Sequence, residues 1–333
     1  MKPIIGITMG DPAGIGPEIV VKALAEKQIN DICTPVVVGD FEALSRCADR
    51  SEVEFDYQTV GIGELQERIP EGRYICSLDN VAPGLQLGVE SAAAGSAAGE
   101  YIEAAAALCK LGTFDAIATA PINKASFNLG GYEFPGHTEF LAHLTQTSEF
   151  HMSFFAGKLR VVLLSNHVSL ANAIEIVKKE KLTSVIRFTD RELGRLMGRK
   201  VSIAVAGLNP HASENGMFGN EEELEIAPAI RECTDSFDID VHGPFSPDTI
   251  FNRAFEGEFD AVIACYHDQA TIAVKCLSFG KGVNVTLGLP IIRTSVDHGT
   301  AFEIAGKNKA DSGSMLAAIK LAAELATQSW TTA

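Results

Sequence analysis

Residues 2–18 are "KPIIGITMGDPAGIGPE", an apolar run that passes through a glycine-rich turn into a helix-like pattern. The turn fits neither common nucleotide-binding motif. The dinucleotide fingerprint needs a glycine where Ile19 stands, and a P-loop needs Gly-Lys-Ser/Thr, whereas Pro17 and Glu18 follow Gly16. With these motifs excluded, the stretch predicts a strand, a tight loop and a helix with proline in its first turn. Glu18 suits the helix dipole there and would repel a phosphate.

The rest of the chain repeats this alternation of short apolar runs and helix-length segments. Such runs, rich in Val, Ile and Ala, are typical of parallel strands covered by helices on both faces. The expected strands are PIIGIT, PVVVGD, FDAIATAP, RVVLLSNH, VSIAVAGLNPH, FDAVIACYHDQ and GVNVTLG. The expected helices include PEIVVKALAEK, VESAAAGSAAGEYIEAAAALCKLG, TSVIRFTDRELGRLM and SMLAAIKLAAELA. The pattern therefore predicts an α/β fold.

Composition indicates an acidic globular chain. Its 333 residues are 46% hydrophobic and 21% charged, enough for two domains or one large α/β unit. The formal net charge of −16 argues against a general nucleic-acid or anionic-membrane binder. Seven scattered cysteines without a C-x-x-C pair argue against a disulfide frame and favour a reducing cytoplasm. No apolar run approaches the ~18 residues of a membrane span or forms a signal-peptide core.

Polar residues follow four expected strands where each strand ends. They are Thr119 to Lys124, Ser165 to His167, Asn209 to His211, and His267 to Gln269. Ligands of open α/β sheets bind outside the carboxyl ends of strands, so we expect these residues to converge. Three ends supply a histidine, and three neutral imidazoles suit zinc or a similar divalent ion. A single histidine is more often a hydrogen-bonded loop residue, but three at equivalent positions favour a metal.

A fourth histidine, His137, follows Gly136 in "PGHTE". This helix start would bind an anion through backbone N–H groups, and capping of the helix by Thr138 is the alternative. The segment "DHGTAFEIAGKNKAD", with Glu303, would form either a loop that wraps a ligand or an ordinary surface loop.

Lys275, Asn284 and Arg293 lie in apolar surroundings in "AVKCLSF", "GVNVTLG" and "PIIRTSV". Cations are costly to bury in such company without an anionic partner. A bound phosphate or carboxylate would supply that partner, and an internal salt bridge is the equally weighted alternative.

Five stretches jointly resemble one known family. They are "TMGDPAGIGPE", "PGHTE", "GLNPHASENG", "YHDQA" and "VNVTLGLPIIRTSVDHGTAFEIAG". In order and over essentially the full length, the chain resembles 4-hydroxythreonine-4-phosphate dehydrogenase of pyridoxine (vitamin B6) biosynthesis, including its 4-phosphothreonate and 4-phosphoerythronate dehydrogenase branch. More distantly, "GDPAGIGPE" and "HGTAFEIAGK" look like "GDGIGPE" and "HGSAPDIAGK" of isopropylmalate and isocitrate dehydrogenases.

The resemblance implies the two-domain isocitrate/isopropylmalate dehydrogenase fold, not a Rossmann fold. It implies a cofactor-side domain of residues 1–127 plus 282–333, which contains both termini, and a substrate, metal and dimerisation domain of residues 128–281. The two domains would flank a cleft. The resemblance also implies an obligate homodimer whose active site takes residues from both subunits.

The resemblance also assigns roles to residues. A divalent metal, zinc with magnesium or cobalt as alternatives, would be bound by His167, His211 and His267, with one supplied by the partner chain. The substrate-binding positions map onto His137, Thr138, Lys275, Asn284 and Arg293. The cofactor-binding positions map onto His298, Gly299, Thr300, Ala301, Glu303 and Asp311. An acidic Glu303 would repel a 2′-phosphate, so NAD is favoured and NADP stays the alternative.

The implied reaction is the NAD-linked oxidation of the C3 hydroxyl of 4-phosphooxy-L-threonine. The resulting β-keto acid would lose CO2 to give 3-amino-2-oxopropyl phosphate. Asp248 and Lys275 are our candidates for proton handling. Ala270 and Ser213 depart from the family's "HDQG" and "NPHAGE", so 4-phospho-D-threonate or 4-phospho-D-erythronate stays open as substrate. A zinc hydrolase is the alternative from another class, although it has no use for the "DHGTAFEIAG" loop.

Overall fold

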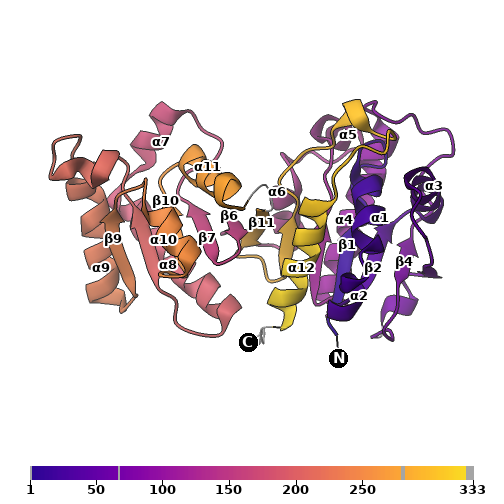
Figure 1. The fold of residues 1–333 in the computed structure, drawn as a ribbon, viewed down its shortest axis with the longest axis horizontal. Helices are drawn as coiled ribbons and strands as arrows, with labels where there is room; N and C mark the ends of the chain where they lie inside the picture. Colours follow the sequence, from indigo (N-terminus) through magenta and orange to yellow (C-terminus); the bar gives the residue numbers. More distant parts are fainter. Residues whose placement is uncertain (1, 67, 279–281, 328–333) are drawn as a thin grey trace. The chain divides into compact units, whose positions relative to one another are not determined.

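The structure is a computed structural model, and it describes residues 2–66, 68–278 and 282–327. The chain divides into two compact units (Figure 1). The first comprises the residues up to Phe150 together with Leu289–Thr327, and the second comprises His151–Gly288.

The first unit is built on parallel strands. Their order is β3 (Gln58–Val60), β4 (Tyr74–Ser77), β2 (Thr34–Gly39), β1 (Ile4–Thr8), β5 (Ala116–Thr119) and β12 (Arg293–Ser295). The five pairings between neighbouring strands in this order are all parallel. Each residue of β1, β2 and β5 is buried, which explains why these strands are apolar throughout and do not alternate.

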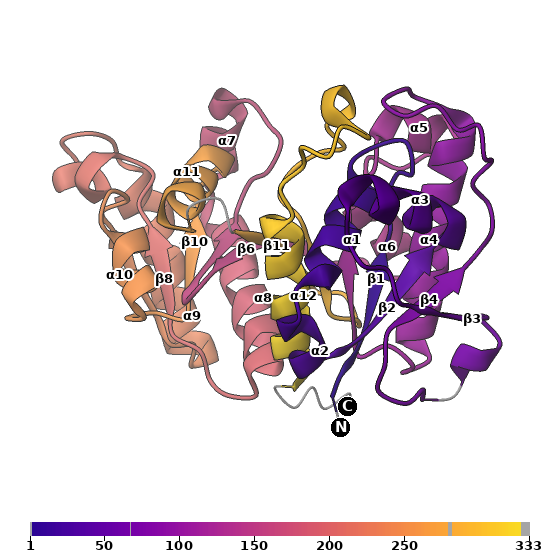
Figure 2. The same cartoon turned by 45° about the vertical axis from the view of Figure 1, so that its right-hand side comes forward.

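Helices cover both faces of this sheet. They are α1 (Gly16–Ala25), α2 (Gln28–Ile32), α3 (Phe41–Ser51), α4 (Ala92–Lys110), α5 (Lys124–Leu129), α6 (His137–Leu144) and α12 (Gly313–Thr327), with the 3₁₀ turns η1 (Glu64–Gln66) and η4 (Phe302–Ile304). Helices α1, α3 and α12 pack together on one face, and α4 packs with α5 and α6 on the other (Figure 2). This is the arrangement that right-handed crossover connections produce.

Close packing on α4 keeps α5 and α6 in the first unit. A Cβ atom at Gly95 would lie only 1.7 Å from the backbone oxygen of Ser126, so the glycine allows α5 to approach α4 directly. Phe127 stacks on Tyr132 at 4.8 Å between ring centroids, and Phe140 of α6 meets both rings edge-on. This cluster anchors the segment that follows β5.

The chain therefore passes between the units later than the sequence analysis expected. The crossings follow Phe150 and precede Leu289, whereas we expected them near residues 127 and 281. Residues 128–150 belong to the first unit because of the aromatic cluster, and residues 282–288 belong to the second. The last six residues of the expected first domain lie outside the described residues.

The second unit has a mixed sheet. Its strand order is β11 (Val283–Leu287), β6 (His151–Ala156), β7 (Leu159–Leu163), β10 (Ala261–Ala264), β8 (Ile203–Ala206) and β9 (Val241–Phe245). Strands β7, β10, β8 and β9 are parallel. Strand β6 pairs antiparallel with both β7 and β11.

The prediction that residues 282–288 form a parallel strand was therefore wrong. Strands β6 and β7 form a tight hairpin because Gly157 adopts a positive φ of 58° in the two-residue connection. Because of the hairpin, β6 runs antiparallel to β7. Strand β11 then pairs with β6, also in the antiparallel orientation.

The second unit also carries helices on its sheet. They are α7 (Leu170–Ile176), α8 (Lys179–Met197), α9 (Ala227–Phe237), α10 (Ile250–Glu256) and α11 (His267–Ser278), with the short turns η2 (Pro210–Glu214) and η3 (Glu222–Ile226). Strands β6, β7, β8 and β10 share an apolar core with α10 and α11. Across residues 2–327, apart from the undescribed positions, no helix has the length and apolar character needed to cross a bilayer.

Candidate functional site

Two of the expected metal-binding histidines lie together in the second unit. His167 follows the carboxyl end of β7, and His267 begins α11 just beyond β10. These two strands are paired neighbours, which brings the two rings to 5.6 Å between centroids. Asn166 and Tyr266 line a cavity with them. The expected convergence at the strand ends therefore holds for this pair.

The surroundings of His267 and Asn166 are suited to a cation. The Nδ1 atom of His267 lies 2.7 Å from a carboxylate oxygen of Asp268. Such a contact orients the ring and leaves Nε2 as the atom for a ligand, as in many metal sites. The Oδ1 atom of Asn166 is buried without a hydrogen-bond partner. Both features fit a bound divalent ion.

His211 lies at the end of β8 in a strained turn. Residues 211–215 all have positive φ, although none is glycine. Two contacts to the buried Glu222 hold Asn209, two residues before His211. Its backbone N–H donates to Oε1 at 2.7 Å and its side-chain amide donates to Oε2 at 2.9 Å. Strain of this kind persists only where neighbouring contacts fix the backbone, and it is typical of functional segments.

Gln269 links the strand ends that supply His211 and His267. Its side-chain amide donates to the carbonyl oxygen of Gly207 at 2.8 Å, and its Oε1 accepts the backbone N–H of Cys265 at 2.7 Å. One side chain therefore fixes the end of β8 relative to the end of β10. The sequence analysis placed Gln269 at a strand end but did not assign it this role.

The three histidines do not form a complete metal site within one chain. Among the residues that the structure describes, no group of three His, Cys, Asp or Glu side chains could bind a metal ion. The ring of His211 instead faces Phe218, at 6.5 Å between centroids.

The two candidates for proton handling are both exposed. Asp248 follows β9 and accepts a hydrogen bond from the Ser246 hydroxyl at 2.5 Å. That bond is the main reason why the pKa of Asp248 is lowered, and positive charge on His211 lowers it further. Lys275 lies on the outer side of α11, next to the buried Val274. The sequence analysis placed Lys275 in apolar surroundings, but in the structure its side chain is exposed, as are those of Ile272 and Cys276 on the same helix.

Asn284 is the other expected substrate-binding residue of the second unit. It lies on β11 and is half-buried. Its Oδ1 atom is buried and has no hydrogen-bond partner. An unsatisfied buried oxygen of this kind is uncommon in proteins, which supports a role in ligand binding.

In the first unit, Arg293 forms the centre of a buried polar group. It begins β12 and is only 3% exposed. Its Nε and Nη2 atoms donate to the hydroxyl of Thr119 at 3.1 and 2.8 Å, and Thr119 ends the neighbouring strand β5. Burial lowers the pKa of Arg293, and the charge of Glu139 opposes this shift. The guanidinium still keeps its charge at neutral pH, because its ordinary pKa is so high.

His137 begins α6 beside this arginine. Its Nε2 atom is buried without a partner, and burial lowers its pKa well below the ordinary value, with a further contribution from Arg293. The helix N-cap is Gly136, and no side chain caps the helix, so the alternative of capping by Thr138 was wrong. A buried cation, an unsatisfied imidazole and an uncapped helix start together fit an anionic ligand.

The glycine-rich turn of the opening stretch packs against the start of the expected cofactor loop, residues 298–311. The backbone N–H of Ile15 donates to the carbonyl oxygen of Thr300 at 3.0 Å. A Cβ atom at Gly14 would lie 2.9 Å from the Cβ of Thr300, so only glycine allows this approach. The opening glycines thus serve backbone packing. Thr300 is buried, whereas His298, Gly299, Glu303 and Asp311 are exposed and Ala301 is half-buried.

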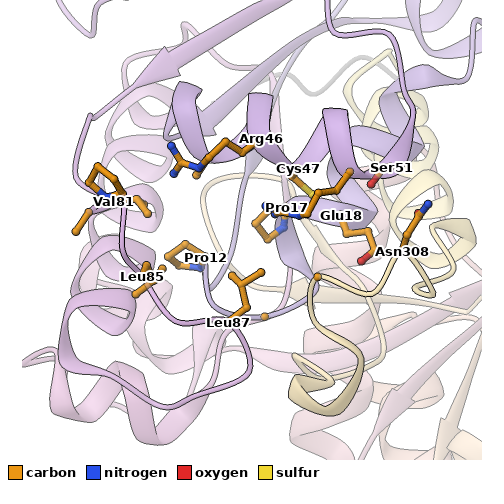
Figure 3. Close-up of a pocket in the computed structure, with 16 residues that line it drawn as sticks. Pro12, Pro17, Glu18, Arg46, Cys47, Ser51, Val81, Leu85, Leu87 and Asn308 are labelled. Carbon is orange, nitrogen blue, oxygen red and sulfur yellow. The ribbon is translucent and has the colours of Figure 1, made fainter.

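A pocket lies behind this loop within the first unit (Figure 3). Pro12, Pro17 and Glu18 of the opening stretch form one side, and α3 contributes Arg46 and Cys47. The remaining walls come from residues 81–87 and from Gly306 and Asn308 of the cofactor loop. The sequence analysis did not find residues 81–87, because they have no motif and no regular secondary structure.

Comparisons with known proteins agree on one family. Residues 31–322 match the family model described as pyridoxal phosphate biosynthetic protein PdxA. D-threonate 4-phosphate dehydrogenase of Cupriavidus necator is 46% identical over 328 residues, which cover 98% of each chain. 4-Hydroxythreonine-4-phosphate dehydrogenase of Geobacter metallireducens is 45% identical and covers 98% of this chain and 96% of the relative.

A solved structure agrees with these sequence matches. The crystal structure of 4-hydroxythreonine-4-phosphate dehydrogenase from Klebsiella pneumoniae superposes with a TM-score of 0.87 at 41% identity. The match covers 98% of this chain and 100% of that one.

Proposed function

Because the chain belongs to the pyridoxal phosphate biosynthetic protein PdxA family, we propose that it oxidises the C3 hydroxyl of a four-carbon acid phosphorylated at C4, with NAD and a divalent metal. The relatives named above are dehydrogenases, which favours this reaction over zinc-dependent hydrolysis. The observation that best supports an anionic substrate is the buried group of Arg293, Thr119 and His137.

Two substrates fit this proposal, and the names of the relatives support both. One is 4-phosphooxy-L-threonine, which carries an amine at C2, and the other is D-threonate 4-phosphate, which carries a hydroxyl there. Both have the reacting hydroxyl at C3, between C2 and the phosphorylated carbon. 4-Phospho-D-erythronate, a stereoisomer of the second, is included in the test below.

The chemistry follows from the position of this hydroxyl. Removal of the hydroxyl proton and transfer of the C3 hydride to NAD give a ketone at C3 and NADH. The ketone is β to the carboxylate, so the C1–C2 bond breaks with loss of CO2, and a proton is then added at C2. The amine substrate gives 3-amino-2-oxopropyl phosphate, and the hydroxy substrates give the corresponding hydroxyketone phosphate.

The three histidines are the proposed metal ligands. The orientation of His267 by Asp268 and the unsatisfied oxygen of Asn166 fit a bound cation. A divalent ion, zinc or alternatively magnesium or cobalt, would lower the pKa of the reacting hydroxyl and polarise the new carbonyl. Glu222 holds the backbone just before His211 through Asn209, and Gln269 links the segments that carry His211 and His267.

The remaining site residues divide into binding and proton handling. We assign the anionic ends of the substrate to Arg293, His137 and Thr138, with Lys275 and Asn284 as further ligands. Asp248 and Lys275 are the candidates to take the hydroxyl proton. The lowered pKa of Asp248 keeps its carboxylate ionised at neutral pH, so Asp248 can accept the hydroxyl proton directly or through a bound water.

NAD binding is assigned to residues 298–311. Glu303 is exposed in this loop and would accept hydrogen bonds from the adenosine ribose. A carboxylate at this position repels a 2′-phosphate, which favours NAD over NADP.

We further propose a homodimer that shares its metal sites. Exposed apolar side chains lie near all three histidines: two follow His167 within three residues, two follow His211 within seven residues, and one lies on the helix that His267 begins. They are Val168, Leu170, Met217, Phe218 and Ile272, which are 44–72% exposed. A second copy that covered these side chains would bring the histidines to the interface. The incomplete ligand set within one chain supports the same assembly.

The cytoplasm is the proposed location. All seven cysteines are free, and six of them are buried. Free thiols and NAD-linked chemistry both suit a reducing compartment.

The proposal is tested by following NADH formation with 4-phosphooxy-L-threonine, D-threonate 4-phosphate and 4-phospho-D-erythronate. We expect one of the three to be preferred and the activity to disappear when a chelator removes the metal. Full activity of metal-free protein would contradict the metal assignment. The absence of NADH formation with all three substrates would contradict the proposed reaction.

A further inference from the structure

A buried ion pair binds the far end of the expected cofactor loop. Glu18, in the first turn of α1, is 3% exposed, and its Oε1 accepts the backbone N–H of Ala310 at 2.8 Å. The same oxygen accepts from Nζ of Lys22 at 2.8 Å, and that Nζ also donates to the carbonyl oxygen of Ala310 at 3.0 Å. One ion pair therefore holds both backbone polar groups of Ala310.

The first helix is suited to this task. Glu18 and Lys22 are four residues apart, so they lie on the same face of α1. Pro17 supplies no N–H donor at the helix start, and a carboxylate in the first turn is favoured by the helix dipole. A carboxylate as buried as Glu18 needs such partners, because burial of an unpaired charge is costly.

Between its two ends, the hydrogen bonds that the structure describes for the loop are local: they link residues within 301–307, and Gly306 lies close to Leu87. Residues 306–309 are exposed, and Ala301, Gly306 and Asn308 have positive φ. The opening stretch binds the loop near its start through the contact between Ile15 and Thr300. The order of a loop of this kind depends on its fixed ends, because exposed segments with few buried contacts open at low free-energy cost.

We propose that Glu18 and Lys22 are positioning residues for NAD: they hold Ala310, and through it Asp311 and the loop, in the conformation that binds the dinucleotide. This inference rests on the proposed function. Glu18 acts through the loop backbone and need not contact the cofactor. Asn308 and Glu18 border the same pocket, so the loop and α1 both contribute to its wall (Figure 3).

Loss of the ion pair should weaken NAD binding without changing the chemical step. If the binding conformation falls to about a tenth of the population, the apparent Kd for NAD rises about tenfold. We therefore expect Glu18→Ala to raise KM for NAD about tenfold, with kcat and KM for the phosphorylated substrate unchanged. Glu18→Gln keeps an acceptor for Ala310 and should show a smaller increase.

The experiment compares these variants with Lys22→Met. This substitution removes the partly exposed cation of the ion pair and leaves the buried Glu18 in place, so it keeps the inference testable if Glu18→Ala fails to fold. Glu26→Gln is the matched control, because Glu26 is exposed at the end of the same helix. Steady-state kinetics is combined with NADH binding by fluorescence and with hydrogen exchange of residues 299–311 in the absence of nucleotide. We expect faster exchange in this loop for Glu18→Ala and Lys22→Met, and no change for Glu26→Gln.

The outcomes separate this inference from the proposed function. If the wild-type protein does not bind NADH, the proposed function fails, and with it the role in NAD binding. If the wild type binds NADH and Glu18→Ala binds it equally well, only the inference on Glu18 is overturned. Faster exchange throughout the first unit, together with reduced kcat, would show a general structural role and would also overturn it.

Discussion

Arg293 is the residue whose environment most directly indicates a ligand. Its guanidinium is nearly inaccessible and is bound by the hydroxyl of Thr119. The sequence analysis could select Arg293 because a cation in an apolar run needs an anionic partner. It could not pair Arg293 with Thr119, since the two residues are 174 positions apart and meet only because β12 lies beside β5.

Replacement of Arg293 tests the anion site. Loss of hydrogen bonds to a charged group costs about 1.5–3 kcal/mol, so Arg293→Met should raise KM for the phosphorylated substrate about 10- to 100-fold. KM for NAD should change little. Arg231→Met, at an exposed position, is the control for the loss of a positive charge. An unchanged substrate KM in Arg293→Met would exclude this residue from substrate binding.

His137 should give the stability of the protein a particular pH dependence. Its pKa is lowered in the folded state, mainly by burial, so below the ordinary pKa of about 6.5 only the unfolded chain takes up the proton. Neutral His137 therefore makes its full contribution to the free energy of unfolding above about pH 6.5. As the pH falls below that value, the free energy of unfolding decreases by about 1.4 kcal/mol per pH unit.

Urea unfolding of the wild type and of His137→Gln at pH 7, 6 and 5 measures this contribution. We expect the free energy of unfolding to fall more steeply for the wild type between pH 6.5 and the lowered pKa. Parallel curves for the two proteins would show that His137 does not titrate as described.

At the scale of elements, the sequence predicted the strands that are buried on both faces. Strands β1, β5, β8, β10 and β11 lie within the expected apolar runs, and β2 and β7 begin one residue before theirs. The sequence analysis missed β6 because its run "HMSFFA" begins with His151 and is interrupted by Ser153. It therefore also missed that β11 pairs antiparallel with β6. The direction of β6 in the sheet is set by the hairpin turn at Gly157. The residues of the strand itself do not indicate that direction.

The contact between α4 and α5 supplies a prediction on packing. In Gly95→Ala the new methyl group would overlap the backbone oxygen of Ser126, and backbone cannot move aside as a side chain can. Overpacking of this kind costs about 1–3 kcal/mol, partly offset by about 1 kcal/mol of helix propensity. We expect a free energy of unfolding lower by up to about 2 kcal/mol than that of Gly63→Ala.

Gly63 is the matched control because nothing lies within 4 Å of a Cβ atom built there. Denaturant unfolding of both variants measures the difference. Equal stability of the two would mean that α5 does not pack on α4 as closely as the structure indicates.

At the scale of the whole molecule, our proposal makes the metal site depend on assembly. The sequence located all three histidines, because each follows a recognisable strand. It could not show that His167 and His267 lie together in one chain while the ligand set stays incomplete. If chains pack together to complete the site, a local sequence pattern cannot identify the ligand that comes from the second chain.

Pairwise mixing of inactive variants tests the shared metal site. We expect His167→Ala, His211→Ala and His267→Ala each to be inactive alone. If one ligand comes from the partner chain, the two pairs that include this ligand should regain activity when coexpressed, and the third pair should not. Random assembly limits the recovery to about a quarter of the wild-type activity. No recovery in any pair would place all three ligands within one chain.

The most direct test of the central claim is a simultaneous measurement of NADH and CO2. The wild-type protein with its metal is given NAD and either a C4-phosphorylated substrate or the same acid without the phosphate. We predict one CO2 for each NADH from 4-phosphooxy-L-threonine or D-threonate 4-phosphate, and little turnover of the unphosphorylated acids. NADH without CO2, or equal turnover with and without the phosphate, would contradict the account.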